Sequence, residues 1–252
     1  MASGPRAATV GAVLPARVVA AFPPRASLRV TLRRHGPLLV LTALLVVLSA
    51  IYVQRHSLGA QTLGRLEAAR SAAGVRPLVL PANFASLTPD EQLVLLINNE
   101  RLSRGLAPGL VSRVAAPQVM AGLFHGRDPV PLVSLPGIIA TDTIWGWSSL
   151  DGATSSSVTA AALEYIDYSW VYNDGWNGSL AATTNVDCTG PGAPGCWGHR
   201  QAVLSPDLTG ATLVIVPGVA YTTQDHQIGT SAAAELIWTT DPRVLAATRP
   251  VS

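Results

Sequence analysis

The sequence predicts an α+β fold, in which helices pack on a small antiparallel sheet, preceded by one transmembrane helix. Three helical patterns occupy the first part of the folded region, and strand-like apolar runs cluster near its end. An uncharged segment over residues 37–53 comes before both. The 252-residue chain is 48% hydrophobic, so it has enough apolar material for one packed domain with accessory segments.

The N-terminal region has the pattern of a membrane anchor. Residues 1–35 are rich in arginine and proline and contain no acidic residue, which is typical of a disordered tail. Residues 37–53 are uncharged and lie at the short end of the length that crosses a bilayer, so we expect a signal-anchor helix over 36–54 that contacts lipid. Arginines at positions 29, 33 and 34 predict a cytoplasmic N-terminus and an extracytoplasmic domain in the cell membrane.

Two alternatives remain for this hydrophobic segment. Leu48-Ser-Ala50 or Leu58-Gly-Ala60 could act as a poor signal-peptidase site, which would release the domain. The segment could also be a buried core helix of a soluble protein, in which case the arginine asymmetry would be accidental. We favour a retained anchor because the basic region before it is long.

The segment that follows is predicted to be a linker. Residues 55–85 mix Arg, Ala, Gly and Pro, and we expect a short helix over 61–73 and an extended stalk over 74–85. The folded extracytoplasmic domain is expected over 86–247. Residues 248–252 form a C-terminal tail.

The domain begins with a clear helix signal. Thr88 can cap the helix, Pro89 suits its first position, and Glu91 completes a capping box. Gly105 is expected to stop this helix. A second helix is expected to begin near Pro117.

Later segments complete the α+β pattern. A third helix is expected over 158–171, followed by a glycine-rich loop and a short helix over 200–204. Strand-like runs occupy 211–216 and 233–238, with a third strand expected over 219–223.

The only two cysteines bracket a loop of Gly and Pro residues. Cys188 and Cys196 lie eight positions apart, and no helix or strand can continue through the residues between them. We expect a disulfide, which requires an oxidising compartment and would stabilise the fold by roughly 2–3 kcal/mol. The loop then presents the sequence Trp197-Gly-His199-Arg200 at a fixed place.

Composition and missing motifs exclude several functions. The net charge is +2, and the sequence has no basic stripe with interleaved aromatic residues, so we expect no nucleic-acid binding. The chain also lacks the Gly-x-Ser-x-Gly motif of serine hydrolases and the His-Glu-x-x-His motif of metalloproteases.

Two motifs resemble a known family. The segment from Glu91 to Pro108 resembles the first helix of the CAP superfamily (cysteine-rich secretory, antigen five and pathogenesis-related proteins), in its bacterial, SCP-like extracellular branch. The segment Gly198-His199-Arg200-Gln-Ala-Val-Leu204 resembles the Gly-His-Arg-x-x-x-Leu signature of that family. The resemblance covers roughly residues 88–240 and implies a three-layer α-β-α sandwich.

The resemblance also implies a central cleft with two histidines and two acidic residues, which bind a divalent metal in some members. His199 matches one histidine, and Asp142 could replace one acid. Where the family has Trp-x-x-Glu, this chain has Trp170-Val-Tyr-Asn173, so the second acid is an amide unless Asp174 or Glu164 substitutes.

The first histidine of the family has no clear match, because His125 lies in the right region on a different local pattern. Weak metal candidates are therefore His199, Asp142, His125 and Glu164. We expect no cofactor, with zinc as the possible metal.

We interpret the chain as a non-catalytic module that binds a ligand or protein partner at the cell envelope. The expected cleft residues are His199, Arg200, Asp142, Trp170, Asn173 and Trp197.

Three other interpretations remain open. The chain could be a metal-assisted hydrolase of an envelope polymer or peptide, with His199 and Asp142 as catalytic candidates. It could be a scaffold whose cleft is vestigial. His199 could also have only a structural role, while Glu164, Asp167 and Glu235 are expected to be solvated charges.

Overall fold

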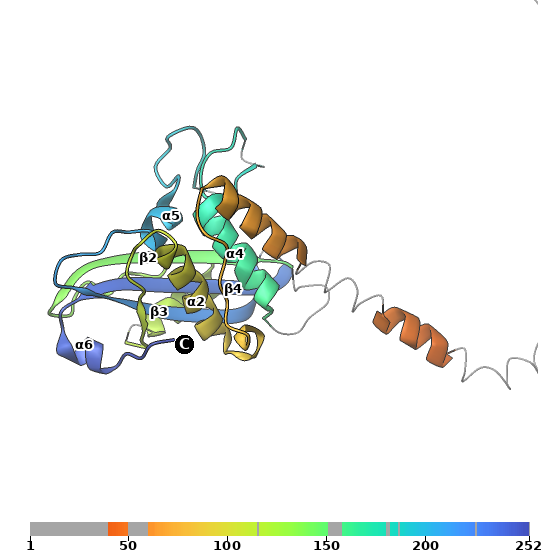
Figure 1. Ribbon diagram of the computed structural model, residues 1–252, viewed down its shortest axis with the longest axis horizontal. Coiled ribbons are helices and arrows are strands. Elements are labelled where there is room, and N and C mark those ends of the chain that lie inside the picture. The colour runs from red at the N-terminus through yellow and green to blue at the C-terminus, as the bar shows by residue number, and fades with distance from the viewer. Residues whose placement is uncertain are drawn as a thin grey trace, which may run out of the picture. The chain divides into compact units, whose positions relative to one another are not determined.

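The computed structural model describes most of the chain after the N-terminal tail (Figure 1). The described residues are 40–49, 60–114, 116–150, 158–179, 182–185, 187–224 and 226–251. The chain divides into two compact units, 1–49 and 50–252, which we describe separately.

In the first unit, residues 40–49 form a helix with exposed leucine and valine side chains. The predicted tail over 1–35 lies outside the described residues, as do residues 36–39 and 50–54 of the predicted transmembrane helix. Within the described part of the chain, no helix has both the length and the apolar character needed to cross a membrane. The transmembrane helix stays a prediction.

The second unit begins with the helix that was expected in the linker. Residues 60–72 are helical, and the side chains of Leu66 and Arg70 are fully buried. Arg70 donates to Glu100 of the helix α2 (Pro89–Leu102) and, through Nε, to the carbonyl oxygen of Arg76 at 3.0 Å. This part of the expected linker therefore packs on the domain, because a buried ion pair holds it there.

The helices follow the sequence signals closely. Thr88 and Glu91 form the predicted capping box at the start of α2, with Thr88 N donating to Glu91 Oε2 at 3.0 Å. Thr159 caps α4, with its side chain accepting from Ala162 N at 3.3 Å. The bounds are η1 (Phe84–Ser86), α2 (Pro89–Leu102), α3 (Ala116–His125), α4 (Ala160–Tyr172), α5 (Gly198–Val203) and α6 (Pro242–Ala246).

The sheet is mixed rather than antiparallel. Its strands are β1 (Leu110–Val111), β2 (Ile138–Ser148), β3 (Thr212–Gln224) and β4 (Gln227–Thr239), in the order β1-β3-β4-β2. The short strand β1 pairs in parallel with β3, whereas the other pairs are antiparallel. The sequence analysis predicted neither β1 nor β2.

Strand β3 continues through Pro217, where the sequence suggested an end. The carbonyl oxygen of Ile215 accepts from Ser112 N at 2.9 Å, so the backbone groups of Ile215 point towards β1. The backbone groups of successive residues in a strand point to alternate edges, so the nitrogen of Pro217 points to the same edge as that of Ile215. This position lies beyond the last pair that β1 makes with β3. Proline is tolerated on such a free edge.

Helices cover both faces of this sheet. Leu213 and Ile215 lie on one face, in a core with side chains of α2, α4 and α5. Val214 and Val216 lie on the other face, in a core with side chains of α3 and α6. This alternation produces two apolar cores and a three-layer α+β arrangement (Figure 1).

Candidate ligand-binding site

The loop before α5 is held by the predicted disulfide. Cys188 and Cys196 are bonded, and Cys188 is fully buried. Trp197 follows with a φ of 65°, a left-handed conformation that turns the chain into α5. Its indole lies against Gly175, where a Cβ atom would be 1.9 Å from Trp197 Cε2. Only glycine at position 175 therefore allows this loop to close on the end of α4.

Asp174 connects the turn after α4 to the first turn of α5. Its carboxylate is buried and lies 2.7 Å from His199 Nδ1, and it accepts from Arg200 N at 3.2 Å and Asn185 Nδ2 at 2.8 Å. Its carbonyl oxygen accepts from Trp197 N at 3.1 Å. One aspartate thus fixes both the start of α5 and the orientation of the imidazole.

His199 lies between two carboxylates. Its Nε2 atom is 3.4 Å from Asp128 Oδ1, opposite the bond to Asp174. Burial alone would lower the pKa of His199, but the hydrogen bonds and charges of Asp128 and Asp174 raise this pKa to about 9. At neutral pH the imidazole is therefore a cation. It has no free nitrogen lone pair with which to act as a general base.

The other end of α5 is held by Arg101 of α2. This side chain is fully buried, and its Nη1 atom donates to the carbonyl oxygens of Val203 and Ser205, both at 2.9 Å. Its Nη2 atom donates to Asp207 Oδ1 at 2.8 Å. A guanidinium at the carboxyl end of a helix is favourable because it pairs with unsatisfied carbonyl groups.

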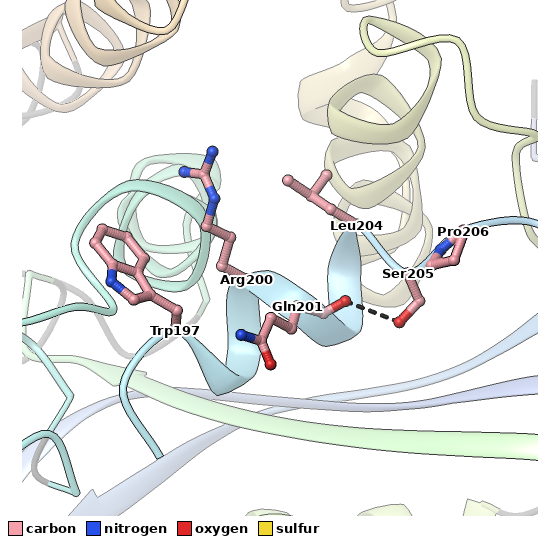
Figure 2. A pocket seen from close by; sticks show the side chains of 6 residues that line it. All are labelled: Trp197, Arg200, Gln201, Leu204, Ser205 and Pro206. Atoms are coloured by element: carbon pink, nitrogen blue, oxygen red, sulfur yellow. Dashed lines mark hydrogen bonds between the residues drawn. The ribbon is translucent and has the colours of Figure 1, made fainter. Parts of the chain in front are cut away.

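Between these two attachments, α5 forms the floor of a groove of about 740 Å³ (Figure 2). Arg200 and Leu204 extend from the same side of the helix, whereas Gln201 points to the opposite side. The lining residues are Trp197, Arg200, Gln201, Leu204, Ser205 and Pro206. Of these, only Arg200 carries a charge.

Arg200 is held in place without an acidic partner. Its Nη1 atom donates to the carbonyl oxygen of Val171 at 2.5 Å. The guanidinium carbon lies 5.5 Å from the centre of the Trp197 ring and 6.0 Å from that of Tyr172. Among the described residues, no carboxylate forms a salt bridge with Arg200.

The structure places the expected cleft residues in different environments. Asp142 of β2 lies 2.9 Å from Ser205 Oγ, at the far end of the groove from His199. Trp170 is buried in the core and donates to the carbonyl oxygen of Trp145 at 2.8 Å. Asn173 ends α4, and its side chain accepts from a neighbouring amide. Trp197 and Arg200 therefore line the groove. His199 and Asp142 do not line it: His199 pairs with Asp174 before α5, and Asp142 accepts from the lining residue Ser205.

The acidic side chains expected to be solvated are instead buried. Asp167 is fully buried on α4, where neither carboxylate oxygen has a hydrogen-bond partner among the described residues, and burial raises its pKa well above the usual value. Burial also raises the pKa of Glu164 to about 7. Glu235 is fully buried in β4, where it accepts from Leu132 N. The prediction that these three side chains are solvated was wrong, because the segments that bury them are distant in sequence.

The metal candidates do not converge. His125 is exposed at the end of α3, Glu164 is buried on α4, and Asp142 is bonded to Ser205. In the part of the chain that the structure describes, no group of three His, Cys, Asp or Glu side chains could hold a metal ion. At His199 a zinc ion would have to displace the bound proton. The donor set does not fit the metal site that the family resemblance implies.

No family model matches this chain, and no curated protein or solved structure is significantly similar to it.

Proposed function

We propose that this chain is a membrane-anchored, extracytoplasmic CAP-like domain that binds a ligand or partner at the cell envelope, without catalysing a reaction. The observation that supports this proposal is the groove along α5. It combines one cation, an indole and an apolar end, as small-molecule sites generally do.

The rigidity of α5 also supports a binding role. The Cys188–Cys196 disulfide and Asp174 hold the amino end of the helix, and Arg101 holds the carboxyl end. A binding surface that is ordered before the ligand arrives loses little conformational entropy on binding.

Placement at the envelope is supported by two features of the sequence. The hydrophobic run over 37–53 follows a basic tail, and the disulfide is typical of proteins outside the cytoplasm. The kinship with the CAP superfamily is supported by the two motifs at Glu91 and His199 and by the arrangement of helices on both faces of a sheet.

A hydrolase is less well supported. The protonated His199 forms ion pairs with the carboxylates of Asp128 and Asp174, so it cannot activate water at neutral pH. Asp142, the expected catalytic partner of His199, accepts a hydrogen bond from Ser205 instead.

The proposal is tested by hydrogen exchange on the full chain in the presence of extracted envelope lipids, glycans and soluble metabolites. We expect at least one fraction to protect the backbone amides of residues 197–205, and we expect Leu204→Asp to abolish that protection. Val133→Asp is the matched control, because Val133 is 74% exposed and does not line the groove. Protection by no fraction, or protection that survives Leu204→Asp, would refute the proposal.

A further inference from the structure

We infer that the α5 groove takes an anionic ligand, a carboxylate or phosphate joined to a flat apolar body, with its acidic group bound by Arg200. This inference rests on the proposed function of the groove and specifies the chemical class of its ligand. It follows from the charge of the lining residues, the fixed position of the guanidinium and the distribution of apolar surface.

The first step concerns charge. Arg200 is the only charged residue among those lining the groove, and it forms no salt bridge with a described residue. Two other cations lie nearby, and both are already paired: His199 with Asp128 and Asp174, and Arg104, which lies over the same Tyr172 ring, with Glu100. The uncompensated positive charge therefore lies at Arg200, where an anion would be attracted.

The second step concerns geometry. The bond from Nη1 to the carbonyl oxygen of Val171 and the rings of Tyr172 and Trp197 hold the guanidinium plane. Tyr172 is fixed in turn by its hydroxyl, which donates to Glu100 Oε2 at 2.7 Å. The Nε and Nη2 donors of Arg200 have no hydrogen-bond partner among the described residues. Two parallel donors in a fixed plane match the two oxygens of a carboxylate or phosphate.

The third step gives the orientation of the ligand. Leu204 and Pro206 provide apolar surface further along the groove, and Trp197 provides an aromatic ring beside Arg200. The carboxylate of Asp142 lies at the Ser205 end, where it would repel an anion. The acidic group is therefore expected at the Trp197 end, with the apolar body lying over Leu204.

Three probes that share a naphthalene ring test this inference: the anions 2-naphthoate and 2-naphthyl phosphate, and the neutral 2-naphthamide. Binding to the detergent-solubilised full chain is measured by calorimetry, with empty micelles as the blank. We expect at least one of the two anions to bind at least tenfold more tightly than the amide. A comparison of the two anions then identifies the preferred acidic group.

Variants assign the preference to one side chain. Arg200→Gln should reduce the affinity for the anion to that of the amide, and Arg200→Lys should lose part of the preference because it keeps the charge without the planar fork. Arg113→Gln is the matched control, because it removes the same charge from a side chain that is 82% exposed outside the groove. We expect it to change neither affinity.

The outcomes separate this inference from the proposed function. Equal binding of anions and amide, or a preference that persists in Arg200→Gln, overturns the anion specificity while the groove remains a binding site. Binding of none of the probes overturns the inference. The proposed function also fails if the envelope fractions give no protection. If Arg200→Gln does not fold, the wild-type comparison of anion with amide still decides the question.

Discussion

Replacement of Asp174 by asparagine should remove a pH-dependent part of the stability of the domain. The side chain keeps its shape, but it loses the charge that faces His199 at 2.7 Å. The bond from Arg200 N becomes weaker as well, since its acceptor is neutral.

The magnitude follows from the pKa of His199. A rise from 6.5 to about 9 corresponds to about 3 kcal/mol, at roughly 1.4 kcal/mol for each pH unit. Because the folded-state pKa is the higher one, this stabilisation is fully present below pH 6.5 and is lost as the pH rises through about 9. Asp174 is 1% exposed and Asp128 is 47% exposed, so we assign about 2 kcal/mol to Asp174.

The assay is urea denaturation of the wild-type chain and the Asp174→Asn variant between pH 6 and pH 10. Asp174→Asn should lower the free energy of unfolding, and this loss should be about 2 kcal/mol larger at pH 6 than at pH 10. Asp128→Asn, at the exposed carboxylate, should show a smaller difference of the same sign. A stability loss for Asp174→Asn that is independent of pH would refute the assignment of a charged His199 to this bond.

Three further predictions test other parts of the structure. Asp167→Asn should increase the free energy of unfolding more at pH 8 than at pH 5 in urea denaturation, because burial raises the pKa of this carboxyl and its ionisation destabilises the fold as the pH rises. Equal changes at the two pH values would contradict this. Gly175→Ala should cost about 2 kcal/mol or more in thermal denaturation, because the new methyl group would overlap Trp197, whereas Gly64→Ala, with no atom within 4 Å, should cost nothing. Reduction of the single disulfide should lower stability by roughly 2–3 kcal/mol and weaken probe binding to the groove; unchanged binding would show that the loop does not position α5.

Local signals predicted most of the helices and the strands β3 and β4, but neither β2 nor α6. The capping box at Thr88 depends on residues three positions apart, and the disulfide closes a loop of consecutive turn residues. The strands β3 and β4 show long apolar runs because both of their faces are covered by helices. Strand β1 could not be predicted, because two residues carry no periodic pattern.

Long-range pairings were beyond the sequence signals. Asp174 lies in the turn-forming sequence Asn173-Asp174-Gly175, and nothing local indicated that its side chain would reach His199, 25 positions away. Asp167 appeared to lie on a polar helix face, but that face packs near Arg70 and Glu100, which come from two other helices. Arg101 likewise has the sequence pattern of a solvated charge, but in the structure it is buried against the carboxyl end of α5. Charged side chains that pair across the fold thus resemble surface residues in the sequence.

The most direct test of the central claim is to map where an anionic probe binds on the full chain. Hydrogen exchange with the tighter-binding of the two naphthyl anions, at a concentration near its dissociation constant, should slow exchange at residues 197–205 and at the neighbouring end of α4. Arg200→Gln should largely remove this protection at the same probe concentration. Protection at another surface, with residues 197–205 unchanged, would contradict the account of α5 as the ligand-binding element.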